Sequence, residues 1–158
     1  MFGQGRGEVR VGMDDSEFLG PVDFLAVEFP SGRMNGSGFR MLRDLVEAGT
    51  IVVLDLEFVL KGADGSVSRL SLDNVPVDSP EDVSSWAGSF SGILDESDLT
   101  VVAETIAPGS LAGVLVYENA WAAPIMAEIT ASGARLLGSG RIDTDDLSDA
   151  LDDARDDV

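Results

Sequence analysis

Carboxylates are the only side chains in this sequence that could do acid/base chemistry or hold a metal. The 158 residues include 29 Asp and Glu but no Cys and no His, which excludes thiol nucleophiles, imidazole catalysis and ordinary zinc sites. Glu28 and Glu118 each stand at the end of an apolar run. If they met at one edge of a sheet, their pKa values could split into those of an acid and a base. The alternative is that each carboxylate anchors a neighbouring loop.

A second group of candidates lies where a predicted strand gives way to a helix, between Gly113 and Pro124. Asn119, directly after Glu118, is either part of a site or a hydrogen-bonding residue of the irregular turn. Trp121 could stack a ligand. However, it lies beside apolar positions of a predicted helix, as Trp86 does, so a core or groove-lining role is favoured for both indoles.

The end of the chain is rich in aspartate. Residues 143–158 contain eight Asp and keep apolar residues at helical spacing, which predicts an acidic helix or tail. Four aspartates at its start could collect Ca²⁺ or Mg²⁺: Asp143, Asp145, Asp146 and Asp149. They lack the ligand spacing and central Gly of a calcium loop, so a solvated acidic face is favoured over a divalent-cation site. The glycine groups also miss the phosphate-binding spacings, and no cofactor is expected.

The overall charge narrows the possible partners. A formal net charge of -19 repels phosphate backbones and anionic lipids, so nucleic acid and membrane surfaces are not expected partners. A basic protein or solubility alone would explain the charge. No apolar run approaches the ~18 residues of a membrane span, and no signal-peptide pattern opens the chain. The expected location is the cytoplasm.

The elements that would position these residues follow from hydrophobic periodicity. Residues 23–29 form a near-continuous apolar run that ends at Pro30, typical of a strand buried on both faces. Residues 52–61 alternate, which predicts a strand whose polar face, with Asp55 and Glu57, meets water or a partner. Between these strands lies a helix pattern closed by Gly49. A hairpin turn at residues 63–66 leads to a shorter strand.

The second half of the chain predicts further helices and strands. Two short helices have their apolar residues at 86–94 and 99–106, a strand follows at 111–118, a helix ends at Gly133, and a last strand covers 135–142. These elements give two β-α-β units, 23–61 and 110–142. We therefore expect an α/β fold of the α+β sandwich kind: an open, ferredoxin-like sheet of about five strands with helices packed on it.

The domain organisation follows from composition. Residues 1–20 are Gly-rich and aperiodic, which predicts a flexible and dispensable N-terminal arm. Residues 21–142 form a single core domain, and 143–158 form the acidic C-terminal helix or tail.

Several segments together resemble an actinobacterial family, domain of unknown function 6325. They are GPVDFLAVEFP from Gly20, LVEAGTIVVLDLEFVLKGADGSV from Leu45, PGSLAGVLVYENAWAAP from Pro108 and SGRI from Ser139. The likeness covers most of the chain between residues 20 and 142. It implies a compact bacterial cytoplasmic domain, and it brings no catalytic or cofactor-binding residues to transfer.

The sequence favours a non-enzymatic domain that acts through protein contacts or as an oligomer, because it offers strand edges and apolar helix faces but no catalytic constellation. The alternative is a carboxylate-based enzyme or a divalent-metal-binding protein that uses Glu28 and Glu118 or the Asp-rich tail. The candidate residues outside that tail are Glu28, Glu118, Asn119 and Trp121.

Overall fold

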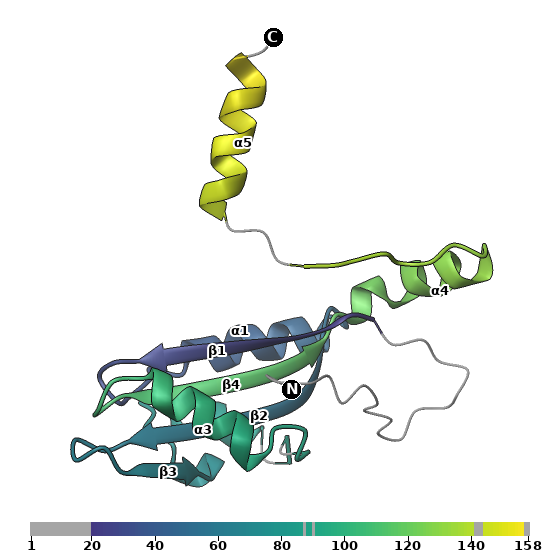
Figure 1. Ribbon diagram of the computed structural model, residues 1–158. Coiled ribbons are helices and arrows are strands. Elements are labelled where there is room, and N and C mark those ends of the chain that lie inside the picture. The colour runs from purple at the N-terminus through teal and green to yellow at the C-terminus, as the bar shows by residue number, and fades with distance from the viewer. Residues whose placement is uncertain (1–19, 87, 90, 141–143, 157–158) are drawn as a thin grey trace. The chain divides into compact units, whose positions relative to one another are not determined.

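The computed structural model describes residues 20–86, 88–89, 91–140 and 144–156. The chain divides into two compact parts between Ala127 and Glu128. The first part holds a mixed α+β fold with one open sheet (Figure 1). Its four strands are β1 (Val22–Phe29), β2 (Val52–Lys61), β3 (Val67–Leu70) and β4 (Leu111–Glu118).

Five α-helices and two 3-10 helices accompany these strands in the described residues. The α-helices are α1 (Ser37–Glu47), α2 (Pro80–Ser84), α3 (Glu96–Thr105), α4 (Ala123–Ala131) and α5 (Thr144–Asp156). The 3-10 helices are η1 (Leu72–Asn74) and η2 (Ala120–Ala122). The division between the two parts falls within α4, and α5 belongs to the second part.

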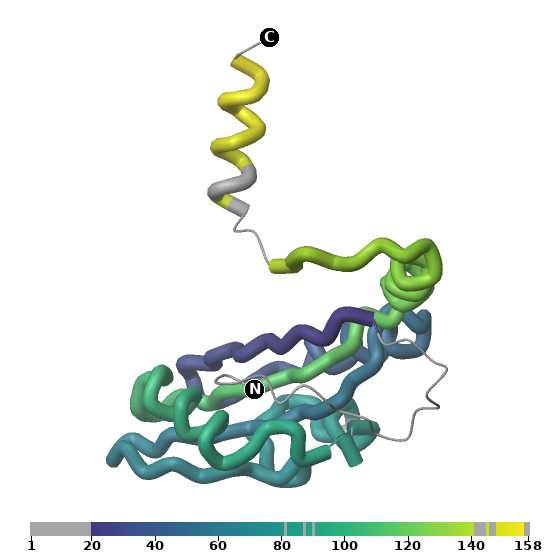
Figure 2. Tube along the Cα trace, turned by 45° about the vertical axis from the view of Figure 1, so that its right-hand side comes forward, coloured from purple at the N-terminus to yellow at the C-terminus, as the bar shows by residue number. Residues whose placement is uncertain are grey.

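The sheet has the strand order β1-β4-β2-β3, and all neighbouring strands are antiparallel. β4 therefore lies between β1 and β2, although α1 joins those two strands in sequence. Figure 2 shows β1, in purple, along one margin of the sheet. In the described residues, β1 and β3 are the two edge strands.

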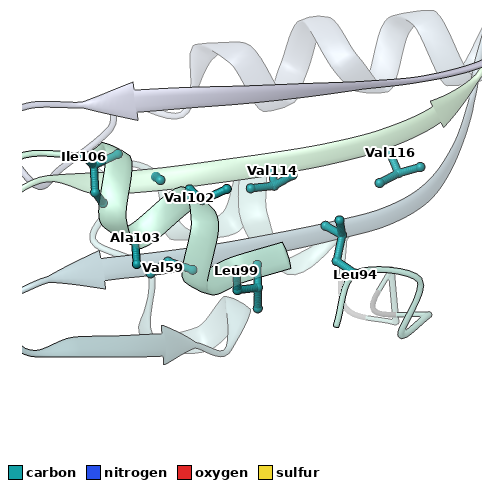
Figure 3. Packing of buried hydrophobic residues seen from close by; sticks show 9 residues of the cluster. Val59, Leu94, Leu99, Val102, Ala103, Ile106, Val114 and Val116 are labelled. Atoms are coloured by element: carbon teal, nitrogen blue, oxygen red, sulfur yellow. The ribbon is translucent and has the colours of Figure 1, made fainter. Parts of the chain in front are cut away.

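Helices cover both faces of this sheet. On one face, α3 packs Leu99, Val102 and Ile106 against buried valines of β2 and β4 (Figure 3). On the other face, Phe39 of α1 packs against Phe58 of β2, with their ring centroids 6.0 Å apart. Alternation along each strand sends successive side chains into these two clusters, so the central strands β2 and β4 are buried on both faces.

Local signals explain where the main helices begin and end. At the start of α3, the Asp95 side chain accepts hydrogen bonds from the N–H groups of Ser97 and Asp98, and the Asp98 side chain accepts one from the Asp95 N–H. This reciprocal pair is a capping box. After α1, Gly49 has a φ of 73°, which suits glycine and ends the helix. The helices predicted before Gly49, over 99–106, before Gly133 and in the acidic tail are confirmed.

The expectation of five strands is not confirmed, and neither is a ferredoxin-like arrangement. Residues 134–140 carry no strand, and residues 141–142 lie outside the described residues. Two consecutive leucines followed by Gly138 and Gly140 give no alternating face, and glycines weaken a strand. The predicted helix at 86–94 is also wrong. α2 ends at Ser84, and Gly88 and Gly92 adopt positive φ angles of 98° and 78°, which a helix does not contain.

The strand predicted to be buried on both faces is an edge strand. β1 pairs only with β4 among the described residues, and seven of its eight residues are exposed. A continuous apolar run is typical of a central strand, but periodicity along one strand carries no information on how many neighbours the strand has. The N-terminal arm expected at 1–20 lies outside the described residues except for Gly20.

Candidate protein-interaction surface

The sheet register does not bring Glu28 and Glu118 together. In the antiparallel pair of β1 and β4, Glu28 lies opposite Ala112 at one end, whereas Glu118 lies opposite Val22 at the other. Six residue steps separate positions 22 and 28, which is about 20 Å along a strand. The two carboxylates therefore cannot work as an acid and base on one substrate group.

Glu28 anchors the connection between α3 and β4. Its Oε1 atom accepts hydrogen bonds from the Ala107 N–H, at 3.0 Å, and from the Ser110 hydroxyl, at 2.9 Å. These bonds, the one from Ala107 first, lower the pKa of Glu28 below its ordinary value because they stabilise the ionised form. Lys61 ends α3 nearby by donating to the carbonyls of Ala103 and Ile106.

Glu118 and Asn119 tie the start of β1 to the end of β4. The buried Glu118 side chain accepts the N–H of Gly20 at 2.7 Å. The Asn119 side-chain amide donates to the Pro21 carbonyl and to Asp23 at 3.0 and 2.9 Å, and its main-chain N–H donates to Pro21 at 2.8 Å. Both residues serve the strand-to-helix turn, as the loop-anchoring interpretation predicts.

The two tryptophans differ. Trp86 is in the core with 7% of its surface exposed, as expected. Trp121 is 59% exposed, so it does not occupy a core position, and the groove-lining alternative stays a prediction. The 3-10 turn η2 buries Ala122 instead and leaves the indole outside, where Nε1 donates to the Asn119 side chain at 3.3 Å.

Two carboxylates on β2 are buried, although the strand's polar face was expected to meet water or a partner. Asp55 is fully buried, and it accepts main-chain N–H bonds from Leu56, Ser91 and Leu94 at 3.0, 3.1 and 2.9 Å. The segment before α3 folds over this face and supplies two of the three donors. Because Asp55 satisfies buried N–H groups that have no strand partner, it holds this segment on the sheet.

Glu57, the second buried carboxylate, forms an ion pair with Arg69 of β3. Arg69 donates from Nε to Oε2 at 3.0 Å and from Nη2 to Oε1. Burial raises the pKa of Glu57 although the arginine opposes the shift, whereas the hydrogen bond that Arg69 donates to Glu57 raises the pKa of Arg69. The hairpin places Arg69 opposite Val59, diagonal to Glu57. Alternation and hairpin register together were the sequence signal for this pair, which the sequence interpretation missed.

In the described residues, no group of three or more Asp and Glu side chains is placed to hold a metal ion. Within the acidic α5, Asp152 lies 3.5 Å from Arg155; Asp143 is outside the described residues. No helix in the described ranges is long and apolar enough to cross a membrane.

The edge strand β1 carries a run of exposed apolar side chains. We use the name β1 edge for the side of β1 that has no neighbouring strand in the described residues, together with its exposed apolar side chains, Val22, Phe24, Leu25, Ala26 and Val27. The four larger side chains are between 38% and 46% exposed. Phe24 lies opposite Val116 and shares the α3 face, whereas Leu25 lies opposite Leu115 and shares the α1 face. The β1 edge is therefore apolar on both faces.

The other edge of the sheet is different in each respect. β3 is four residues long and carries Ser68 and Arg69, whereas β1 is eight residues long and carries no Lys, Arg or Pro. Short length and charged side chains are the usual protection of an edge against pairing with another chain. β3 is short and carries Arg69, whereas β1 is longer and has its two charged side chains, Asp23 and Glu28, near its ends.

Comparisons with protein-family models, with curated proteins and with solved structures find no match for this chain. The resemblance to domain of unknown function 6325 therefore stays a prediction.

Proposed function

We propose that this protein is a non-enzymatic interaction module whose contact surface is the β1 edge. The observation that carries the proposal is a long edge strand with exposed apolar side chains on both faces, in a sheet whose other edge strand is four residues long. Exposed apolar strand edges are templates for pairing with another chain. The net charge and composition support the further proposal that this interaction module is cytoplasmic. The segments quoted above support a relation to domain of unknown function 6325.

The enzymatic alternative has less support. It depends on convergent carboxylates, and Glu28 and Glu118 lie at opposite ends of β1 and β4. The buried Asp55 and Glu57 are engaged with main-chain N–H groups and with Arg69.

Site-specific photo-crosslinking in cells tests the proposal. A photoreactive phenylalanine analogue replaces Phe24 in the β1 edge, and a matched variant carries the analogue at Val67, which is exposed on β3. We expect discrete crosslinked adducts from position 24 and none from position 67. Absence of adducts from position 24, or equal adducts from both positions, would reject the β1 edge as the contact surface.

A further inference from the structure

We infer that Trp121 and Asp23 form a binding site for an arginine side chain of a basic partner peptide, with the guanidinium stacked on the indole and paired with the carboxylate. Both residues lie close to the start of β1 and the end of β4. The site does not use the side of β1 that lacks a neighbouring strand, so neither this site nor the proposed contact surface depends on the other.

Trp121 is exposed but held in place by its own chain. It is 59% exposed, and its main-chain N–H donates to the Thr50 carbonyl at 3.2 Å. The indole Nε1 donates to Asn119 Oδ1 at 3.3 Å. An indole N–H points outward in the plane of the ring, so this bond does not occupy a ring face. A large aromatic side chain that is already ordered loses little conformational entropy on binding, and such residues are typical anchors of an interface.

The side-chain amide of Asn119 places a carboxylate beside this indole. Asn119 Nδ2 donates to Asp23 Oδ2 at 2.9 Å and to the Pro21 carbonyl at 3.0 Å, and the Asn119 main-chain N–H donates to the same carbonyl at 2.8 Å. Asn119 therefore bridges Trp121 and Asp23 through one amide group, which keeps the indole nitrogen and the carboxylate within about 8 Å of each other. Asp23 is exposed, so one ligand group can meet both side chains.

The charge of the surrounding domain suits a cationic ligand. Residues 20–127 carry 16 Asp and Glu against five Lys and Arg. All five basic side chains have partners within the described structure: Lys61 holds the end of α3, Arg69 pairs with Glu57, Arg33 pairs with Asp78, and Arg40 and Arg43 lie near Asp82. An acidic domain of this kind attracts a cation and repels an anion, so charge complementarity favours a basic partner at Trp121 and Asp23.

Arginine fits the two groups better than lysine or an apolar side chain does. A cation over an aromatic face is attracted by the ring quadrupole, and tryptophan attracts it most strongly. The guanidinium is planar, so it stacks on a ring while its N–H groups reach a carboxylate at the side. The ammonium of lysine is compact and strongly hydrated. An apolar side chain would pack on the indole but would leave the Asp23 charge without a counterpart.

Selection of short random peptides, displayed on phage, against the purified full chain tests the inference. We expect the enriched peptides to share an arginine, and the affinity of the synthetic peptide to fall about tenfold for Trp121→Ala. Trp121→Leu keeps an apolar side chain without a ring and should weaken binding to a similar extent. Asp23→Asn keeps an oxygen that can accept from Asn119 but removes the charge, and it should weaken binding about threefold. Fluorescence anisotropy of the labelled peptide measures each affinity.

Matched controls separate this site from general stickiness and general charge. Val67→Ala on β3 and Asp73→Asn on η1 change an exposed apolar side chain and an exposed carboxylate elsewhere, and they should leave the affinity unchanged. Circular dichroism verifies that every variant folds. In the peptide, citrulline in place of arginine keeps the shape without the charge and should cost about tenfold in affinity. Four results overturn the inference: no enriched peptide, enriched peptides without a shared arginine, undiminished binding of the citrulline peptide, or undiminished binding to Trp121→Leu.

The arginine site and the β1 edge fail in different ways. Arginine peptides whose binding depends on Trp121, together with no crosslinked adduct from position 24, keep the arginine site and reject the β1 edge. Adducts from position 24 without such peptides keep the β1 edge and reject the arginine site.

Discussion

At the scale of single residues, Glu28 shows how a carboxylate at a strand end serves the fold. Its two hydrogen bonds hold the residues after α3 against β1, and they lower its pKa below the ordinary value of 4.5. A lowered pKa in the folded state means that ionised Glu28 stabilises the fold. That stabilisation is complete above the ordinary pKa and is lost as the pH falls through the lowered one.

The first prediction follows from this sign. Glu28→Gln should lower the free energy of unfolding at pH 7, and its difference from wild type should shrink as the pH falls below about 4.5. Urea unfolding at several pH values measures it. Glu104→Gln, at an exposed position of α3, is the control and should change little at pH 7. A difference for Glu28→Gln that grows toward acid would contradict the assigned role.

A second residue-scale prediction concerns Gly20. A Cβ atom at this position would lie 2.0 Å from the Asn119 carbonyl oxygen, while one at Gly38 would meet nothing within 4 Å. Gly20→Ala should therefore destabilise the fold by on the order of 2 kcal/mol, since main chain cannot yield as a flexible side chain does. Gly38→Ala, in α1, should stabilise it by up to about 1 kcal/mol. Equal effects in thermal unfolding would show that residue 20 is not held against Asn119.

At the scale of elements, β2 shows that an alternating strand need not face water. Its buried Asp55 lies beneath the segment before α3 and accepts main-chain N–H bonds from Ser91 and Leu94 of that segment. Asp55→Asn keeps the shape but replaces one acceptor oxygen by a donor that faces other donors. We expect a loss of about 3 kcal/mol in urea unfolding. Asp73→Asn, on the exposed side of η1, should stay within about 0.5 kcal/mol.

Replacing the two tryptophans by alanine should lower the free energy of unfolding by unequal amounts, because their surroundings differ. Trp86→Ala empties a core site and should cost about 3–5 kcal/mol. Trp121→Ala removes a largely exposed side chain and should cost about 1 kcal/mol or less. Denaturant unfolding of the two variants compares them directly. A cost for Trp121→Ala as large as that for Trp86→Ala would mean that the indole is covered in solution.

At the scale of the whole molecule, the charge acts against stability. A net charge of -19 disfavours the compact state through self-repulsion. Salt weakens this repulsion between charges farther apart than the Debye length, which is about 10 Å at 0.1 M. The urea midpoint should therefore rise when NaCl is raised from about 0.05 to 0.5 M, provided that protein concentration is fixed at a level where the chain is monomeric. A falling midpoint would show that ion pairs such as Glu57–Arg69 outweigh the repulsion.

The sequence by itself determined the elements that depend on local chemistry. Signals a few residues long predict the helix α3, the glycine that ends α1, the hairpin between β2 and β3 and the strand β4. The exclusion of thiol and imidazole chemistry follows from composition alone. At the candidate site, the loop-anchoring alternative for Glu28 and the turn-bonding role of Asn119 were also available from sequence, because each residue acts beside a predicted chain reversal.

Only the tertiary structure decided which strands have two neighbours. The continuous apolar run of β1 is typical of a central strand. In the described sheet, however, β4 lies between β1 and β2, so β1 is an edge strand. The antiparallel pairing of β1 with β4 set Glu28 and Glu118 at opposite ends of the two strands, and the segment before α3 covers Asp55. These outcomes depend on pairings between residues tens of positions apart, whose free energy comes from packing and desolvation that no local pattern encodes.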